Sequence, residues 1–366
     1  MHIACMIGSL SKGGSERVMC NLIQYFIEHN HQVTLVTQYK RNDEYPLDDR
    51  VNRIISDINP ERVGNNRALN FIRRFQKLRN IWKTEKPDAI LVFIGKNNIM
   101  ALLTAWGLHI PVVVSVRADP NQEYPNRWMR FMACHLFKKA AGVILQTREC
   151  MEFFPKAVQQ KSVILHNPVN EVFFENPYKG DREHTIVTVG RIDENKNQAL
   201  LLRAFARIAA DYPDYQILLY GKGDQEENLK RLAGDLGIAE RVTFAGNISD
   251  VADKIRKAGV FVLTSNTEGM PNALIEAMVS GLPVIATDCP CGGPRDLIDH
   301  GKNGLLTPVD DVEKMKENLQ FMLNNSQNAY QMGQNARKTT DIYREEIVYQ
   351  EWMAYLMSVA GKQMIQ

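Results

Sequence analysis

The sequence has few cysteines, no strong excess of either charge and no long unbroken apolar run. Its six cysteines form no C-x-x-C pair, which excludes a disulfide-stapled fold and the usual structural zinc sites and favours a reducing compartment. A formal net charge of +2 with 23% charged residues excludes an intrinsically disordered chain, and we expect no nucleic-acid partner. What remains is 366 residues, 45% of them hydrophobic, enough for two domains that each have a core.

The nearest approach to a membrane span is residues 99–116, which hold Gly107, His109 and Pro111 between two apolar stretches. These three residues, and the β-branched run that follows them, favour a helix, a turn and a buried strand over a transmembrane helix. The first residues enter a strand-like pattern directly, without the charged stretch typical of a signal peptide. We therefore expect a cytoplasmic protein without a membrane span.

Short apolar runs alternate with amphipathic stretches along the chain, and the alternation restarts near residue 185. Strands are predicted for His2–Ile7, Val33–Thr37, Ala89–Ile94, Val112–Val116 and Gly142–Gln146, and then for Thr185–Val189, Tyr215–Tyr220, Val242–Ala245, Val260–Leu263 and Val284–Thr287. Strands separated by helices form parallel sheets covered on both faces. The predicted fold class is therefore α/β, with two doubly wound, Rossmann-like domains facing a cleft.

The polar stretch Asn167–His184, rich in proline and charge, separates the two series of strands. We expect an N-terminal domain over residues 1–168, a C-terminal domain over 185–342, and a final helix over 343–366 that returns toward the first domain. Residues 1–175 carry 23 basic and 16 acidic side chains, a net charge of +7, whereas the rest carries 21 and 26, a net charge of −5. Opposite charges indicate that the two domains meet different partners.

The sharpest pattern is S-N-T-E-G-M-P-N-A-L-I-E-A-M, which begins at Ser265 directly after a predicted strand. Pro271 suits the first position of a helix that Gly281 would end, so Glu268 would lie in the turn at its N-terminus. Unpaired amides there form a site for phosphate or sugar oxygens. Glu276 is the only ionisable residue of this otherwise apolar helix, and its carboxylate needs a partner, either a ribose diol or a structural arginine.

A second pattern, G-R-I-D-E-N-K-N from Gly190, follows the first strand of the same domain. Arg191 and Lys196 flank this turn and could clamp a diphosphate, one through its planar fork and the other as a point charge. Two solvated surface cations are the alternative interpretation. Both patterns fall at the carboxyl edge of one predicted sheet, which favours a binding site.

Four patterns, in their order along the chain, resemble those of the retaining nucleotide-sugar glycosyltransferases of the GT-B fold, in the large bacterial group that makes lipid-linked and cell-surface glycans. They are the glycine-rich first loop from Gly13, the turn with Gly190, Arg191 and Lys196, the E-x7-E pair Glu268 and Glu276, and the loop C-P-C-G-G-P-R-D from Cys289. The resemblance extends over essentially the whole chain.

The resemblance implies a role for each matching position. Arg191 and Lys196 would neutralise the donor diphosphate and the departing nucleoside diphosphate, and Glu268 would bind hydroxyls of the donor sugar; these three would be the catalytic residues. Glu276 would hold the ribose of a UDP- or GDP-sugar. The other donor contacts would come from Gly13, Gly14, Gly190, Ile248, Gly269, Met270, Pro271, Asn272 and Leu274. No D-x-D motif occurs, so the two cations would replace a metal ion, and we expect neither a metal nor a cofactor.

One position departs from the family pattern. Many members have a histidine after the fourth strand of the first domain, where this chain reads V-R-A-D-P from Val116. No histidine can therefore be assigned to the sugar, and Arg117 and Asp119 become candidates for contact with donor sugar or acceptor. An Arg–Asp ion pair that braces the loop is the alternative.

The motifs do not name the acceptor, but the first domain carries a basic and aromatic signal. The segment Arg62–Lys86 holds eight basic residues and one acid beside apolar residues at helical spacing, and Arg127–Lys139 repeats the theme. Both would also serve as ordinary amphipathic helices packed on a sheet. Because a basic residue near an anionic leaflet is worth about 1 kcal/mol, we expect a peripheral enzyme on the inner face of the membrane. Its glycan acceptor would be linked to a polyprenyl diphosphate, as is common among the related enzymes.

Other functions on the same scaffold stay open at this point. A sugar-nucleotide epimerase would use the same donor contacts without an acceptor. A catalytically inactive partner subunit would only bind the donor or a lipid, but the four intact charged residues of the motifs argue against it. An NAD-dependent oxidoreductase is not indicated, because no G-x-G-x-x-G with a following ribose-binding acid is present.

Overall fold

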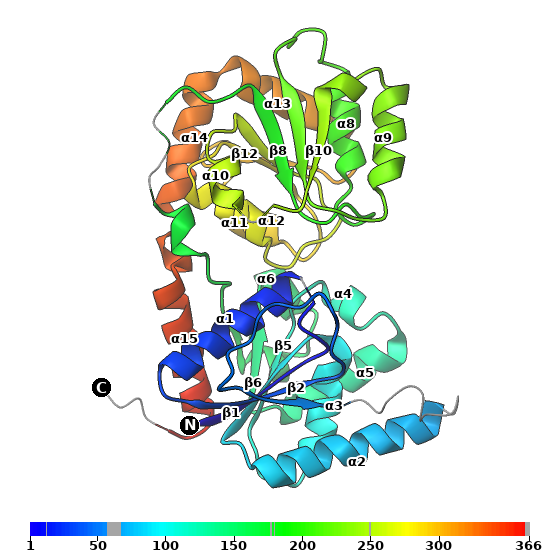
Figure 1. Ribbon diagram of the computed structural model, residues 1–366, viewed down its shortest axis with the longest axis vertical. Helices are drawn as coiled ribbons and strands as arrows, with labels where there is room; N and C mark the ends of the chain where they lie inside the picture. Colours follow the sequence, from blue (N-terminus) through cyan, green and yellow to red (C-terminus); the bar gives the residue numbers. More distant parts are fainter. Residues whose placement is uncertain (12, 57–66, 176–177, 179, 249, 363–366) are drawn as a thin grey trace. The chain divides into compact units, whose positions relative to one another are not determined.

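The computed structural model describes residues 1–11, 13–56, 67–175, 178, 180–248 and 250–362 (Figure 1). The α carbons cluster into two units, one made of Met1–Pro168 and Glu346–Gln366 and the other of Val169–Glu345. Each unit is built on one sheet of parallel strands with helices on both faces. The predicted fold class, α/β with two doubly wound parallel sheets, is confirmed.

In the described residues the sheet of the first unit has seven strands in the order β3-β2-β1-β4-β5-β6-β7. They are β1 His2–Ile7, β2 Gln32–Thr37, β3 Asn52–Ile55, β4 Ala89–Phe93, β5 Val112–Ser115, β6 Gly142–Leu145 and β7 Ser162–Ile164. The main helices are α1 Gly14–Glu28, α2 Arg67–Glu85, α3 Gly95–Ala105, α4 Pro120–Glu123, α5 Arg127–Leu136, α6 Arg148–Glu152 and α7 Lys156–Gln159. The strand order reverses between β1 and β4, so the loops that follow these strands lie where open α/β sheets bind ligands.

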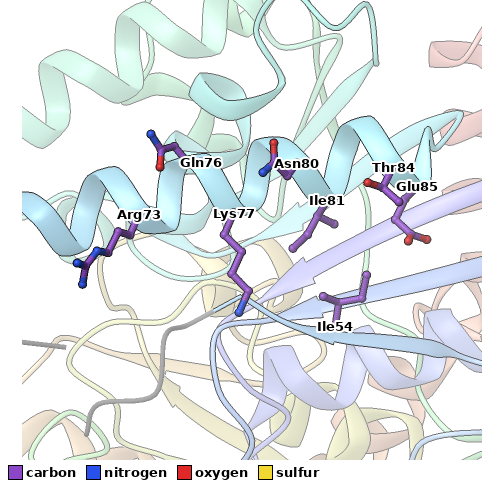
Figure 2. Close-up of a pocket in the computed structure, with 8 residues that line it drawn as sticks. All are labelled: Ile54, Arg73, Gln76, Lys77, Asn80, Ile81, Thr84 and Glu85. Atoms are coloured by element: carbon purple, nitrogen blue, oxygen red, sulfur yellow. The ribbon is translucent and has the colours of Figure 1, made fainter. Parts of the chain in front are cut away.

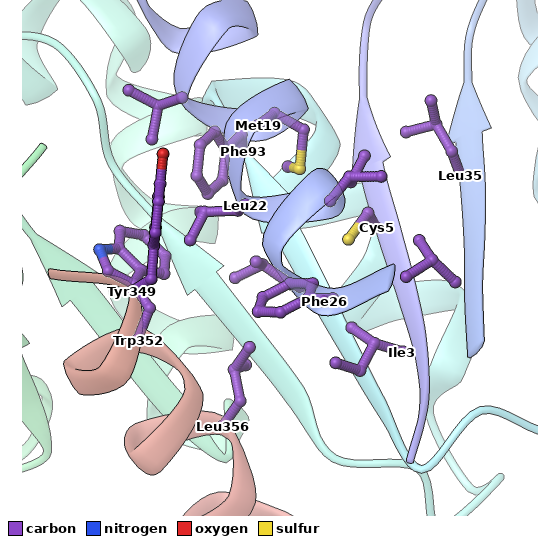
Figure 3. Close-up of a cluster of buried hydrophobic side chains, with 14 of the residues drawn as sticks. Ile3, Cys5, Met19, Leu22, Phe26, Leu35, Phe93, Tyr349, Trp352 and Leu356 are labelled. Atoms are coloured by element: carbon purple, nitrogen blue, oxygen red, sulfur yellow. The ribbon is translucent and has the colours of Figure 1, made fainter. Parts of the chain in front are cut away.

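The last helix of the chain, α15 Glu345–Val359, completes the core of the first unit. Its buried residues Tyr349, Trp352 and Leu356 recur at helical spacing and pack against α1 and one face of β1 (Figure 3). Trp352 is fully buried, and its indole N–H donates a hydrogen bond of 3.0 Å to the carbonyl of His166. The apolar periodicity of this segment therefore arises from packing on α1 and β1, near the other end of the chain.

In the described residues the sheet of the second unit has six strands in the order β10-β9-β8-β11-β12-β13. They are β8 Thr185–Val189, β9 Gln216–Tyr220, β10 Val242–Gly246, β11 Val260–Leu263, β12 Val284–Thr287 and β13 Leu305–Thr307. The main helices are α8 Gln198–Ala206, α9 Glu226–Asp235, α10 Val251–Ile255, α11 Asn272–Val279, α12 Gly293–Leu297, α13 Val312–Asn324 and α14 Ser326–Lys338. Alternate residues of β11 face two separate clusters, one with α10 and α11 and the other with α8, α9 and α13.

All ten predicted strands are present, each within one residue at either end. The sequence interpretation missed β3, β7 and β13, which have three or four residues and lie at the edges of the sheets. Residues 99–116 form the end of α3, a turn and β5, as predicted. In the described part of the chain no helix is both long enough and apolar enough to cross a membrane.

Candidate functional site

The two charged loops predicted for the second unit meet, because they follow the neighbouring strands β8 and β11. The ammonium nitrogen of Lys196 lies 2.5 Å from Oε1 of Glu268. The hydroxyl of Ser265 donates a second hydrogen bond of 2.5 Å to the same oxygen. The Lys196 and Glu268 side chains are 19% and 12% exposed, so this ion pair is at the surface yet partly shielded from water. Ser265 had been assigned no role from the sequence.

Uncharged side chains lock the two loops together. The Asn195 side-chain amide donates to the Thr267 carbonyl at 3.1 Å, and the Thr267 hydroxyl donates back to the Asn195 side-chain oxygen at 3.1 Å. The backbone N–H of Asn266 donates to the Asn195 carbonyl at 2.7 Å. The Thr264 hydroxyl donates to the Lys196 carbonyl at 2.7 Å. The ion pair therefore rests on a hydrogen-bonded frame that the sequence patterns did not reveal.

Arg191 is the most exposed charge of this site. Its side chain is 72% exposed, and its guanidinium lies 3.2 Å from the carboxylate of Asp193. The same carboxylate accepts the backbone N–H of Lys196 at 2.9 Å, so Asp193 organises the turn that carries both cations. The backbone packs tightly below: a Cβ at Gly221, whose φ is +135°, would lie 1.8 Å from the carbonyl oxygen of Gly190. Only glycine fits there.

Helix α11 begins one residue later than predicted. Pro271 is the residue before its first turn, and no side chain caps the helix. The N–H of Leu274, one of the expected donor contacts, donates to the Pro271 carbonyl at 3.1 Å within the first turn of the helix. The helix runs to Val279, and Gly281 follows its cap residue in the left-handed conformation (φ +71°), the position predicted for it. The Glu276 side chain is 5% exposed on this helix, far more enclosed than Arg191.

A second loop supports the turn at Glu268. The backbone N–H of Glu268 donates to the Pro290 carbonyl at 3.2 Å. A Cβ at Gly293 would lie 1.6 Å from the carbonyl oxygen of Gly269, so the two backbones touch. Burial and the nearby Glu268 charge raise the pKa of the Cys289 thiol to about 12. Cys289 and Cys291 are buried and form no disulfide within the described residues.

The remaining donor-site candidates are spread over both units. Met270 is buried in the core that supports α11, and Ile248 is half-buried against it. Asn272 is the first residue of α11. Gly13 and Gly14 belong to the first unit, where Gly13 precedes α1 and Gly14 begins it. In the described residues no cluster of His, Cys, Asp or Glu could hold a metal ion.

Arg117 and Asp119 do not form the ion pair considered as an alternative. The Arg117 guanidinium is stacked on the rings of Phe93 and Trp352, at 4.7 and 5.5 Å from their centroids, and donates a hydrogen bond to the side-chain oxygen of Asn167. Arg117 is 7% exposed, and burial lowers its pKa to about 9. Asp119 instead caps α4, accepting the N–H of Asn121 at 2.8 Å.

A hollow of about 450 Å³ lies between α2 and the edge strand β3 of the first unit (Figure 2). Ile54, Arg73, Gln76, Lys77, Asn80, Ile81, Thr84 and Glu85 line it. Glu85 is fixed there, because its carboxylate accepts hydrogen bonds from Thr34 and Asn52 at 2.9 and 3.1 Å. The hollow holds none of the predicted donor contacts, but Arg73 and Lys77 belong to the basic segment noted in the sequence.

Helix α2 buries apolar side chains in its C-terminal half and exposes them in its N-terminal half. In its C-terminal half Leu78 and Trp82 are fully buried, whereas in its N-terminal half Phe71 is 51% and Ile72 50% exposed. Arg62 lies outside the described residues. On α5 Trp128 is 68% and Phe131 50% exposed, and their rings stack with centroids 5.7 Å apart. The first unit therefore carries exposed aromatic and aliphatic groups on the two segments that are also rich in cations.

Comparison with protein families gives two matches that together run from residue 12 to residue 339. Residues 12–172 match the model described as Glycosyltransferase Family 4. Residues 169–339 match the model described as Glycosyl transferases group 1. The boundary between these matches falls beside the boundary between the two structural units.

Individual relatives match nearly the whole chain. An uncharacterized glycosyltransferase of Haemophilus influenzae is 27% identical over 94% of this chain and 97% of its own. A Campylobacter jejuni enzyme is 25% identical over 98% of this chain and 99% of its own. Its name describes an α-1,4-N-acetyl-D-galactosaminyltransferase acting on GalNAc-α-(1→4)-GalNAc-α-(1→3)-diNAcBac-PP-undecaprenol. The crystal structure of Anabaena Alr3699/HepE with UDP-glucose is similar in fold, with a TM-score of 0.82, 18% identity and coverage of 98% of this chain and 100% of that one.

Proposed function

We propose a specific reaction for this chain, which belongs to the retaining glycosyltransferases of the GT-B fold and transfers a sugar from a nucleotide-sugar donor. In our proposal the donor is a UDP- or GDP-hexose and the acceptor is a glycan carried on a polyprenyl diphosphate at an anionic membrane surface. The observation that supports the proposed donor site is the Lys196–Glu268 ion pair at the carboxyl edge of the second sheet.

Lys196 and Arg191 are the proposed partners of the donor diphosphate. Lys196 has three N–H donors and uses one on Glu268, which leaves donors for phosphate oxygens. Arg191 extends into solvent beside Asp193 and can turn its fork onto a diphosphate. When the bond between the sugar and the phosphate breaks, negative charge grows on the departing phosphate. Fixed cations lower the energy of that state more than that of the bound donor.

Glu268 is the proposed contact of the donor sugar. Both hydrogen bonds that it accepts within the described structure fall on Oε1, so Oε2 can accept a sugar hydroxyl. Gly269 to Asn272 would add backbone groups at the start of α11, and Glu276 would hold the ribose. Because Glu276 is 5% exposed, that contact requires the ribose to reach a carboxylate that is almost fully buried.

The names of relatives and the surface of the first unit support a lipid-linked acceptor. The Campylobacter jejuni relative is named for an undecaprenol-linked substrate. Exposed Phe71, Ile72, Trp128 and Phe131 lie on segments rich in lysine and arginine, the combination that inserts into the interface of an anionic leaflet. Arg117 and Asp119 at the carboxyl edge of β5 are the proposed acceptor-side residues.

The test of the reaction uses wild-type protein, UDP-N-acetylgalactosamine or UDP-glucose, and undecaprenyl-diphosphate-linked N-acetylgalactosamine. Release of UDP with formation of a longer lipid-linked glycan is expected. Epimerised donor without transfer, or no chemistry with either donor and their GDP-linked counterparts, would overturn the proposal.

The test of the surface is flotation with anionic liposomes at low and high salt. Binding at low salt is expected, and it should weaken with salt because the cations contribute. The double variant Phe71→Ser/Trp128→Ser should lose most of it. The matched control Phe321→Ser/Tyr330→Ser removes two exposed rings from the second unit and should bind like wild type. Equal loss in both double variants, or no binding at low salt, would favour a soluble acceptor.

A further inference from the structure

We propose that Glu123 is a positioning residue for the transfer, because its carboxylate holds the loop that carries Arg117 against the first turn of α3. This inference rests on the proposed function, in which that loop meets the acceptor. Glu123 is the last residue of α4, just after the loop that follows β5. Nothing in the sequence patterns singled it out.

One carboxylate ties together the ends of two strands. Oε1 of Glu123 accepts the backbone N–H of Arg117 at 2.7 Å and that of Ala118 at 3.0 Å. Oε2 accepts the backbone N–H of Gly95, the first residue of α3, at 2.7 Å. Arg117 follows β5 and Gly95 follows β4, which are neighbours in the sheet. The relative placement of the two loops therefore depends on this side chain.

The turn that Glu123 holds is strained. Ile94 has φ +75° and Gly95 has φ +37°. A β-branched residue with positive φ is a clear outlier, which costs of order 1–3 kcal/mol and persists only where the surroundings enforce it. The contacts that enforce it include the bond from Gly95 to Glu123 and a bond of 3.2 Å from the Ile94 N–H to the Ser115 carbonyl.

The loop on the other side carries a buried cation with spare donors. Two nitrogens of Arg117, Nε and Nη1, are buried and have no hydrogen-bond partner among the described residues. An unpaired buried cation is costly, so its exact placement matters for any oxygen ligand that it is to receive. Glu123 fixes the backbone of Arg117, while Asn167 fixes the end of its side chain.

The ionisation of Glu123 bears on this arrangement. Burial raises its pKa to about 7, against the opposing influence of its three N–H donors and of the Arg117 charge. Arg117 is the charged group that faces Glu123 from the loop after β5, and α3 contributes the N–H of Gly95. The adjacent Tyr124 hydroxyl accepts a hydrogen bond from the side-chain amide of Asn98. A proton on Oε2 would point at the N–H of Gly95, so two hydrogen-bond donors would face each other. A proton on Oε1 would face the N–H groups of Arg117 and Ala118 in the same way. Protonation therefore weakens the hydrogen bonds that hold the two loops, although it also removes the cost of burying the charge.

The experiment compares wild type with Glu123→Gln, whose side chain keeps the shape of glutamate but can accept hydrogen bonds through only one oxygen. The control is Glu152→Gln, at an exposed residue of the same unit. Amide hydrogen exchange is measured at pH 8 on the full chain without substrates. We expect Glu123→Gln to speed exchange at least 10-fold in peptides spanning 94–98 and 116–123, and Glu152→Gln to leave it unchanged. Equal exchange in all three proteins would overturn the proposal.

The kinetic arm uses the donor and lipid-linked acceptor named above, between pH 5.5 and 8.5. Wild-type kcat should rise as pH increases through about 7. Glu123→Gln should lower kcat about 10- to 100-fold at pH 8, as expected for misplacement of reacting groups, with the donor KM unchanged and the pH step absent. Glu123→Asp should keep the pH step at a reduced rate. A Glu123→Gln profile parallel to that of wild type would contradict a positioning role.

The two proposals fail in different ways. If wild type transfers no sugar to the lipid-linked acceptor, the proposed function is wrong, while the exchange comparison still tests Glu123. If wild type transfers sugar and Glu123→Gln matches it in rate, pH profile and exchange, only the role of Glu123 is wrong. Melting temperatures of all variants identify any protein that fails to fold.

Discussion

The carboxyl edges of the two sheets are held by different chemistry. In the second unit the loops around Lys196 and Glu268 are joined, besides this ion pair, by neutral amides and hydroxyls such as those of Asn195 and Thr267. In the first unit the corresponding loops are joined by the carboxylate of Glu123 beside the buried guanidinium of Arg117. Neutral hydrogen bonds keep their geometry across the physiological pH range, whereas a buried carboxylate with a raised pKa does not. We therefore expect pH to act on the carboxyl edge of the first sheet, the proposed acceptor side, and to spare the carboxyl edge of the second sheet, the proposed donor edge.

The largest expected effect tests the donor edge itself. Lys196→Ala removes a fixed cation from the proposed leaving-group site and should lower kcat about 100- to 1000-fold, the usual loss for one transition-state donor. The fold should stay intact, because Lys196 is at a loop surface. Lys230→Ala is the control, since it breaks surface ion pairs with Glu226 and Glu227 in the same unit. Near-normal kcat in Lys196→Ala would mean that the diphosphate binds elsewhere.

A smaller effect is expected from disturbing the frame without touching a charge. Gly293→Ala places a Cβ 1.6 Å from the Gly269 carbonyl, so the turn before α11 must shift. Overpacking of this kind costs about 1–3 kcal/mol, and we expect the donor KM to rise about 5- to 100-fold. Gly234→Ala is the matched control, because its Cβ would meet nothing within 4 Å. Isothermal titration with UDP separates weaker donor binding from slower chemistry; unchanged affinity would show that the frame tolerates the shift.

The contrast in ionisation predicts a modest effect on stability. Burial raises the pKa of Glu123 on folding from its ordinary value of 4.5 to about 7, so the folded chain binds this proton more tightly than the unfolded chain. Its stabilising contribution is complete below about pH 4.5 and is lost as pH rises through about 7. The melting temperature of wild type relative to Glu123→Gln should fall over this range, by about 2–4 °C per kcal/mol. A difference that stays constant with pH would contradict the raised pKa.

The smallest effect is expected from chelation. If Arg191 and Lys196 neutralise the diphosphate, EDTA should leave the transfer rate unchanged, because no divalent ion is needed for that charge. Rates are measured before and after dialysis against EDTA, with magnesium or manganese added back. Loss on chelation with recovery by either ion would show that the cations of the donor edge do not suffice.

That the two charged loops of the second unit meet could be predicted from sequence, because each is a local pattern at the end of a strand. The turn at Gly190 and the turn at Glu268 each follow an apolar run, and the parallel order of β8 and β11 brings them together. The frame of Asn195 and Thr267 escaped prediction, since a hydrogen bond between loops about 70 residues apart leaves no periodic signal. Glu123 escaped for the same reason: its role depends on burial and on the amide of Gly95, which no spacing encodes.

In the fold, too, local sequence patterns could be predicted and features that depend on tertiary contacts could not. The buried apolar strands in the centre of each sheet were predicted to within one residue, whereas the three- and four-residue edge strands β3, β7 and β13 were missed. Edge strands are short and half solvated, so their sequences lack a continuous apolar run. Helix α2 was predicted as one amphipathic helix, but only tertiary structure distinguishes its packed half with Trp82 from its exposed half with Phe71.

The order in which a ribosome makes this chain has a consequence for its first unit. The core around Leu22 and Phe26 is closed by Trp352 (Figure 3), which is synthesised after the entire second unit. At about 5–20 residues per second, on the order of 10–40 s separate the emergence of residue 168 from that of α15. During that interval the part of this core that Trp352 and Leu356 cover is exposed to solvent. The nascent first unit is therefore a natural client for chaperones, and truncation before Trp352 should yield a protein that aggregates.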